Sequence, residues 1–245
     1  KEICLISSIG RLSPEKGIYE LICAFRKALK QNSSLRLLII GEGDEEKKIR
    51  KAYTLNADLI VIDLESTVPE NQKDSTKKII KACNVNKKNT YIRINNNLDL
   101  DFVTIENFSG IFLPFTENKA QLKEIDDLLR KKENHKTDII PILESIDGLK
   151  NLEEICSFNE RVNLVSFGSH DLAKSINLKV SDDEREILEF RKTIIKYSFK
   201  PIDTSYLNFK DSIGYKKSCV LAKKLGFGGK ACIHPNQIEI ANNIF

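Results

Sequence analysis

The sequence has no methionine and no tryptophan, and it has no apolar run close to the length of a membrane span. A helix needs about 20 consecutive apolar residues to cross a bilayer, so we expect no membrane-spanning helix. The first residues also lack the basic, apolar and small-residue pattern of a signal peptide. These absences predict a cytoplasmic protein without a membrane partner.

Metal-binding cysteine pairs are absent as well. The six cysteines show no C-x-x-C spacing, and most lie within apolar segments, which is typical of reduced, buried thiols. The sequence also has no large excess of one charge: it contains 39 basic and 35 acidic residues, for a net charge of +4. This balance predicts no nucleic-acid partner.

What the sequence does contain is a regular alternation of strand-like and helix-like segments. Eight short, continuously apolar segments are separated by stretches with apolar residues at helical spacing, a pattern typical of parallel strands covered on both faces. The pattern predicts an α/β fold, a (β/α)8 TIM barrel over residues 35–245, preceded by a short βα extension over residues 1–34. The predicted barrel strands are 36–41, 58–63, 90–95, 110–115, 138–143, 162–168, 199–203 and 230–235.

Two acidic residues at predicted strand ends are candidate metal ligands. The loops at the carboxyl ends of parallel barrel strands build the active site, and Glu144 and Asp171 follow adjacent strands there. Two bare carboxylates that lie close together raise each other's pKa, and a divalent cation between them removes this cost. Oxygen ligands with positions left for water and substrate suit Mg²⁺ or Mn²⁺.

Further polar residues at the same strand ends are candidates for the chemistry. Arg93 would stabilise an enolate oxygen or bind a substrate carboxylate. His170, or a bound water, would act as general base. The remaining strand-end residues are Asp63, Glu65, Asp203, His234 and Asn236.

Plainer interpretations stay open for these residues. Glu144 alone is also typical of a helix cap or an ion-pair partner, and Arg93 of an ion pair at the barrel bottom. His170 is compatible with a loop-lining role. His234 lies within IHPNQ, where proline and asparagine indicate a turn, and His135 is expected at the surface.

Seven ordered segments share a further pattern. They read ADLIVIDLESTVP, YIRIN, GIFLP, IIPILES, LVSFGSHDLA, KPIDT and LGFGGKACIHPNQIEIANNIF. Together they resemble, from about residue 36 to the end, the citrate lyase beta-subunit-like branch of the HpcH/HpaI aldolase superfamily.

This resemblance implies a Mg²⁺-dependent barrel, usually a homotrimer or homohexamer, that breaks or forms carbon–carbon bonds through an enolate. By motif, Glu144 and Asp171 would be the metal ligands and Arg93 would hold a substrate oxygen. Asp63 and Glu65 would shape the pocket. The implied substrates are 3-hydroxyacyl-CoA thioesters, such as citryl-, malyl- or citramalyl-CoA, or 2-keto acids.

The sequence departs from this family's usual pattern in three places. Ser66 stands where an acid is usual, and Phe115 stands where a lysine is common. The sequence ends at Phe245, whereas longer members continue into a helical region over the site. The last departure argues against thioesterase or malate-synthase-like activity, and against CoA binding with it.

The beginning of the chain carries a second resemblance. SSIGRLSPEKGIYELICAFRKALKQNSSLRLLIIGEGDEEKKIR is similar to the start of the nucleotide-sugar-binding half of retaining GT-B glycosyltransferases. This likeness implies that Arg11 and Lys16 contact a donor diphosphate, although a solvated loop is the plainer interpretation.

The leading hypothesis is a Mg²⁺-dependent carbon–carbon lyase or aldolase acting on a small carboxylate or acyl-CoA substrate. One alternative is a non-catalytic barrel or accessory domain in a polysaccharide-biosynthesis or lyase complex. Another is a glycosyltransferase remnant, which predicts tight binding of a nucleotide sugar.

Overall fold

A computed structural model describes residues 4–9, 35–40, 44–66, 68–83, 85–198 and 201–245 of the chain. Its centre is a parallel seven-stranded sheet in which each strand pairs with the next one along the sequence. The strands are β3 (Ile60–Asp63), β4 (Thr90–Arg93), β5 (Gly110–Leu113), β6 (Asp138–Leu143), β7 (Ser166–Phe167), β8 (Ile202–Asp203) and β9 (Gly229–Lys230). All seven fall in or next to predicted segments.

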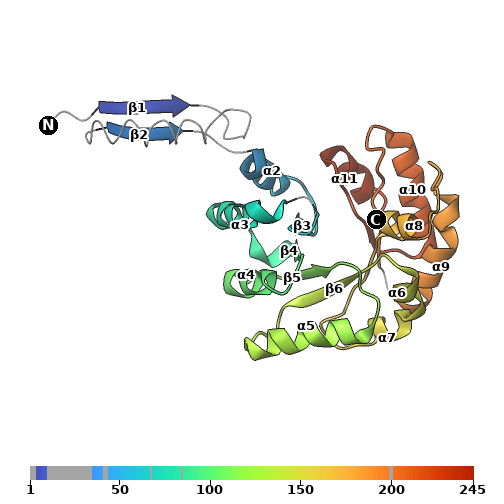
Figure 1. Cartoon of the computed structure of the whole chain (residues 1–245). Helices are drawn as coiled ribbons and strands as arrows, with labels where there is room; N and C mark the ends of the chain where they lie inside the picture. Colours follow the sequence, from blue (N-terminus) through green and yellow to red (C-terminus); the bar gives the residue numbers. More distant parts are fainter. Residues whose placement is uncertain (1–3, 10–34, 41–43, 67, 84, 199–200) are drawn as a thin grey trace.

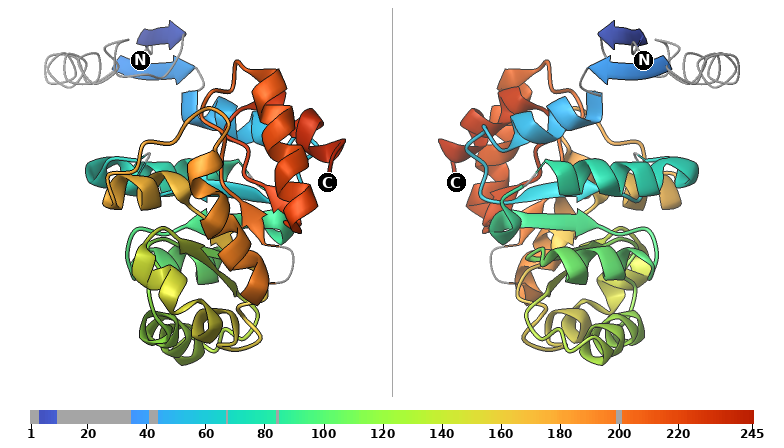
Figure 2. Two further views of the ribbon diagram at one scale, coloured as in Figure 1. Left: turned by 90° about the vertical axis from the view of Figure 1, so that its right-hand side faces the viewer. Right: turned by 90° about the vertical axis from the view of Figure 1, so that its left-hand side faces the viewer.

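Helices follow the strands and cover the outer side of the curled sheet (Figure 1 and Figure 2). Within the described residues, short 3-10 helices span Glu70–Gln72, Lys87–Asn89 and Arg185–Ile187. The α-helices are α2 (Asp44–Ala52), α3 (Lys73–Ala82), α4 (Asp99–Glu106), α5 (Lys119–Lys131), α6 (Ile146–Lys150), α7 (Leu152–Cys156), α8 (Ser169–Ser175), α9 (Leu188–Tyr197), α10 (Ser212–Leu225) and α11 (Pro235–Asn242).

The closed eight-stranded barrel expected from the sequence is not confirmed, because the first predicted strand has a different partner. That segment does form a strand, β2 (Leu35–Ile40), but it pairs in parallel with β1 (Cys4–Ile9) in a separate two-stranded sheet. The six residues of β1 pair in register with the six residues of β2. The backbone groups along one edge of β2 therefore find hydrogen-bond partners in β1 instead of in a barrel strand. The predicted domain boundary between residues 34 and 35 stays a prediction.

Alternation along the strands decides which side chains face the inside of the curled sheet. Tyr91, Phe112, Ile140 and Ile142 form a small inner cluster, whereas a larger cluster lies between the sheet and the helices. Successive side chains of a strand point to opposite faces. The inner face therefore includes position 93, two residues after Tyr91, and position 144, two residues after Ile142.

The two edges of the sheet are linked near the C-terminus. The side-chain amide of Asn242, in the last residue of α11, donates a hydrogen bond of 2.6 Å to the backbone carbonyl of Asn56, shortly before β3. Gly226 caps the C-terminus of α10, and its left-handed φ of 112° lets the chain turn into β9. Among the described helices, none is both long enough and apolar enough to span a membrane.

Candidate active site

An ion pair between neighbouring strands forms one side of the site. Asp63 and Arg93 are register partners at the ends of β3 and β4. Arg93 donates through Nε to Asp63 Oδ1 at 2.8 Å and through Nη2 to Asp63 Oδ2 at 2.7 Å. Its Nη2 also lies 3.1 Å from Glu65 Oε2 and donates to the Ser66 hydroxyl. The guanidinium is therefore at the carboxyl ends of the strands, and the barrel-bottom alternative for Arg93 is wrong.

Electrostatics hold this pair in its charged form. Burial alone would raise the pKa of Asp63, but the hydrogen bonds and the charge of Arg93 outweigh it and lower that pKa. Burial likewise opposes the charge of Arg93, while Asp63, Glu65 and Glu144 together raise its pKa. Arg93 is thus the cation shared by three carboxyl groups of the inner face.

Glu144 lies at the centre of the site and is only 4% exposed. Its Oε2 accepts a hydrogen bond of 3.0 Å from the backbone N–H of Phe115. Burial raises the pKa of Glu144 to about 7; the Phe115 N–H and Arg93 oppose this rise, and the nearby Asp171 and Glu65 add to it. The cap of the following helix is Ser145, so the helix-cap alternative for Glu144 is wrong.

Asp171 stands in the first turn of α8, directly after β7. Glu144 and Asp171 both follow the carboxyl ends of the neighbouring strands β6 and β7, and the charge of Asp171 adds to the raised pKa of Glu144. Between them, the backbone of Gly168 packs against Glu144 so tightly that a Cβ on Gly168 would lie 2.3 Å from Glu144 Cγ. The site has no room for a side chain at position 168.

The charge balance of the rim fits a divalent cation. The rim carries the carboxyl groups of Asp63, Glu65, Glu144 and Asp171. Three of them, those of Asp63, Glu65 and Glu144, are coupled to the single guanidinium of Arg93, and burial raises the pKa of Glu144 despite that cation. Within the part of the chain that the structure describes, no group of three or more His, Cys, Asp or Glu side chains is arranged to hold a metal. A cation on Glu144 and Asp171 would therefore take its other oxygen ligands from water and substrate.

The histidines have different surroundings. His170 Nε2 lies 2.9 Å from the backbone carbonyl of Ser205, so the ring is anchored to the loop after β8. His234 caps α11 by accepting the Asn236 N–H at 3.2 Å, and it stacks on Phe209, which confirms the predicted structural role. His135 is exposed, as predicted.

Asp203 does not belong to the rim, although it ends a strand. Its neighbour Ile202 packs on the inner cluster, so Asp203 points to the helix side, where it is fully buried. There it pairs with Arg191 of α9 at 2.9 Å and with Lys230 of β9 at 2.6 Å. The strand-end rule fails here because the side of the sheet matters as much as the end.

Comparisons with known proteins identify the family of the chain. A sequence model of the HpcH/HpaI aldolase/citrate lyase family matches residues 36–235. The chain belongs to this family. It is thereby a member of a family of carbon–carbon lyases, which is the reaction class that the ordered segments predict. The family match begins at residue 36, and the likeness of the first 50 residues to glycosyltransferases is not borne out.

Several relatives of this HpcH/HpaI protein are known. The mitochondrial citramalyl-CoA lyase of Mus musculus is 28% identical over 239 residues, with 86% of this chain and 71% of that protein covered. Citrate lyase subunit beta of Haemophilus influenzae is 24% identical over 230 residues, with 86% and 79% covered. The citrate lyase beta subunit of M. tuberculosis, solved with oxaloacetate and magnesium, superimposes with a TM-score of 0.71 at 23% identity, covering 82% of this chain and 92% of that one.

Two features of the site were not predicted from the sequence. The Phe115 N–H reaches Glu144 because Phe115 has a left-handed φ of 48°, which is rare for a bulky residue. The departure from the family pattern at this position was the available signal. Gly168 ends the predicted strand 162–168, and its close contact with Glu144 is not evident from the sequence. Arg11 and Lys16 lie outside the described residues.

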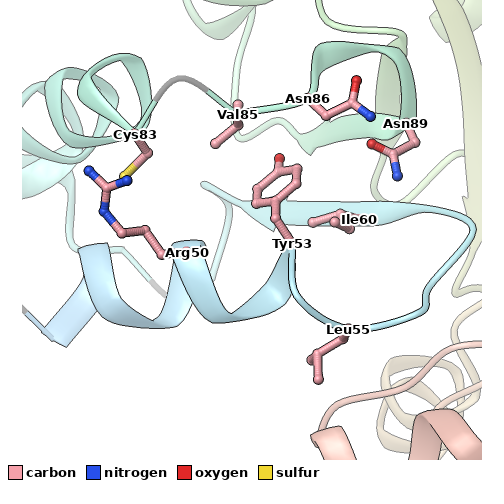
Figure 3. Close-up of a pocket in the computed structure, with 8 residues that line it drawn as sticks. All are labelled: Arg50, Tyr53, Leu55, Ile60, Cys83, Val85, Asn86 and Asn89. Atoms are coloured by element: carbon pink, nitrogen blue, oxygen red, sulfur yellow. The ribbon is translucent and has the colours of Figure 1, made fainter.

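A pocket of about 310 Å³ lies at the opposite, amino-terminal end of the strands (Figure 3). It includes the first residue of β3 and the residue before β4, whereas the candidate site uses the last residues of these strands. Its lining consists of Arg50, Tyr53, Leu55, Ile60, Cys83, Val85, Asn86 and Asn89. The pocket is therefore not part of the candidate active site.

Proposed function

We propose that the protein is a Mg²⁺- or Mn²⁺-dependent lyase that cleaves a carbon–carbon bond in a 3-hydroxyacyl-CoA thioester or a 2-keto acid. The observation that supports this proposal is that Arg93, Glu144 and Asp171 lie at or just after the carboxyl ends of strands of one parallel sheet, with Glu144 coupled electrostatically to the other two. Membership of the HpcH/HpaI family supports the reaction class.

Glu144 and Asp171 would hold the cation, which when bound supplies positive charge for the substrate oxygens and for an enolate. The Phe115 N–H orients Glu144, since it occupies Oε2 at 3.0 Å. The magnesium in the M. tuberculosis structure supports the choice of metal.

Arg93 would bind the carboxylate or carbonyl oxygen of the substrate. Its planar donors match two oxygens at once, and Asp63 fixes its orientation through two hydrogen bonds. Cleavage of a 3-hydroxyacyl thioester requires a base to take the hydroxyl proton while the carbon–carbon electron pair moves to the carbon next to the thioester. Because a His170 ring nitrogen is anchored on Ser205, a water molecule is the better candidate for that base.

The names of the relatives support the proposed substrate class. The murine protein is a citramalyl-CoA lyase, and one M. tuberculosis structure holds magnesium, acetoacetate and coenzyme A. We therefore place citramalyl-, malyl- and citryl-CoA first among substrates to test, followed by oxaloacetate. A homotrimer or homohexamer stays a prediction, and light scattering of the purified protein tests it.

Glu144→Gln tests the proposal because it keeps the shape of the side chain and removes its charge. We expect the variant to fold, to lose most of its Mg²⁺ affinity in calorimetry and to lose turnover of the acyl-CoA thioesters. Glu160→Gln, which changes a side chain that is 81% exposed, is the matched control and keeps both. Cleavage by Glu144→Gln at the parent rate would refute the assignment.

A non-catalytic barrel is the second candidate. It is favoured by the ion pairs of Arg93, because Asp63 and Glu65 already occupy a guanidinium that a substrate would need. This candidate predicts that the protein binds neither Mg²⁺ nor acyl-CoA thioesters, whereas the lyase proposal predicts binding of both.

A further inference from the structure

The first turn of α8, which carries Asp171, is fastened to the end of β8 by two buried hydroxyl groups. Ser169 donates from its Oγ to Thr204 Oγ1 at 2.8 Å, and its backbone N–H points to the same oxygen at 3.3 Å. Both side chains are inaccessible to solvent, at 0% and 1% exposure. A buried hydroxyl that serves two donors is costly to remove, because neither donor can turn to water.

Thr204 itself is held by a rigid neighbour. Asp203, the preceding residue, accepts two hydrogen bonds of 2.9 Å from Arg191 and one of 2.6 Å from Lys230. All three charged side chains are fully buried. Arg191 also pairs with Glu184 at 2.8 Å, which balances the second positive charge of the group. This buried charge cluster fixes the backbone at the end of β8.

The next residue of α8 is fastened to the same segment. His170 contacts the backbone carbonyl of Ser205 at 2.9 Å, so residues 169 and 170 are bound to residues 204 and 205 respectively. Asp171 follows immediately. Before Ser169, Gly168 packs against Glu144. The four-residue turn 168–171 therefore contacts one proposed ligand through Gly168 and carries the other, Asp171.

We infer that Thr204 is a positioning residue that acts through Ser169 to hold Asp171 at the correct distance from Glu144 for a shared divalent cation. The inference rests on the proposed function. Thr204 accepts hydrogen bonds from Ser169, two residues before Asp171. Its hydroxyl sets the orientation of the α8 turn, and the charge cluster around Asp203 makes that hydroxyl a fixed point.

The test compares Mn²⁺ affinity among three variants, measured by electron paramagnetic resonance of free Mn²⁺ at a temperature where circular dichroism shows each to be folded. Thr204→Val has nearly the same shape but lacks the accepting oxygen, and we expect it to weaken Mn²⁺ binding roughly ten- to a hundredfold, as loss of an outer hydrogen bond does at metal sites. Thr204→Ser restores the hydroxyl and should restore the affinity.

Thr90→Val is the matched control for a general loss of stability. Thr90 is also fully buried, and its hydroxyl forms hydrogen bonds with the Tyr53 hydroxyl at 2.5 Å and the Asn86 carbonyl at 2.6 Å. It lies at the amino-terminal end of β4, away from the rim residue Arg93 at the other end. We expect this variant to melt at a lower temperature and to bind Mn²⁺ as the parent does. If Thr204→Val does not fold, Ser169→Ala removes the partner hydroxyl and should weaken binding in the same direction.

The outcomes separate the inference from the proposal beneath it. Parent-like Mn²⁺ affinity in a folded Thr204→Val, or in Ser169→Ala where that variant takes its place, overturns the positioning role and leaves the lyase proposal standing. Equal weakening by Thr204→Val and Thr90→Val also overturns it, because the effect would then be one of stability. A parent protein that binds no Mn²⁺ overturns the proposed function and, with it, this inference.

Discussion

Asp63 and Arg93 face each other from paired positions of β3 and β4 and form a two-point ion pair at 2.8 and 2.7 Å. The pair lies on the inner face of the sheet, next to the buried Glu144. A substrate carboxylate that binds Arg93 must therefore share the guanidinium with Asp63 rather than find it unpaired.

Asp63→Asn should loosen Arg93 and destabilise the fold. The side chains are about one-fifth exposed, so we expect a loss of about 1–3 kcal/mol in the free energy of unfolding at pH 7. Because the folded-state pKa of Asp63 lies below its usual 3.8, this stabilisation is present above that value and is lost as the pH falls through the folded pKa. Urea unfolding at pH 7 and pH 3 measures it, and equal stabilities of parent and variant at pH 7 would contradict it.

Glu144 should give the metal-free protein a pH-dependent stability of the opposite sign. Its pKa rises from 4.5 to about 7 on folding, so between these values the folded state keeps a proton that the unfolded chain releases. Raising the pH through this window therefore lowers the free energy of unfolding, by at most about 1.4 kcal/mol per pH unit. Glu144→Gln should flatten this part of the profile, and an unchanged slope in the variant would exclude Glu144 as its source.

Gly168→Ala should damage the site through a single methyl group. The added Cβ would lie 2.3 Å from Glu144 Cγ and 2.6 Å from its Oε1, so the carboxylate must move. We expect a stability loss of about 1–3 kcal/mol and a strong loss of Mg²⁺ affinity in calorimetry. Gly229→Ala is the control, since its Cβ would meet no atom within 4 Å. Parent-like metal binding by Gly168→Ala would show that Glu144 has freedom the structure does not display.

Phe115→Gly should leave metal binding at the site unchanged while removing the backbone strain at position 115. Phe115 has a φ of 48°, which costs a bulky residue about 1–2 kcal/mol and costs glycine little, and its ring is half exposed. Glycine retains the N–H that Glu144 accepts, so we expect unchanged Mg²⁺ affinity and equal or higher thermal stability. A large loss of Mg²⁺ affinity would mean that the ring, and not the backbone, supports Glu144.

The sequence was informative wherever local pattern decides the outcome. Seven of the eight predicted barrel strands form the curled sheet, and Glu144, Asp171 and Arg93 lie at or just after its carboxyl edge because parallel strands end at the same edge. Asp203 ends its strand as predicted, but a strand end does not by itself say which face of the sheet a side chain takes. Because Ile202 packs on the inner cluster, Asp203 faces the helices.

Other features depend on contacts between distant segments. The pairing of β2 with β1 is one such feature, because the sequence of an apolar strand does not specify which parallel strand it will pair with. The contact of Ser169 with Thr204 joins positions 35 residues apart. Neither the residue types nor their spacing in the sequence predicts this hydrogen bond, since buried serine and threonine hydroxyls occur throughout a fold of this kind.

The most direct measurement is anomalous X-ray scattering from crystals of the protein soaked with Mn²⁺ and oxaloacetate. We expect one strong peak between the carboxylates of Glu144 and Asp171, with oxaloacetate oxygens on the ion and a substrate oxygen within hydrogen-bond distance of Arg93. A soaked crystal with Mn²⁺ elsewhere, or with no ion between these two carboxylates, would contradict a metal-dependent lyase site at this rim.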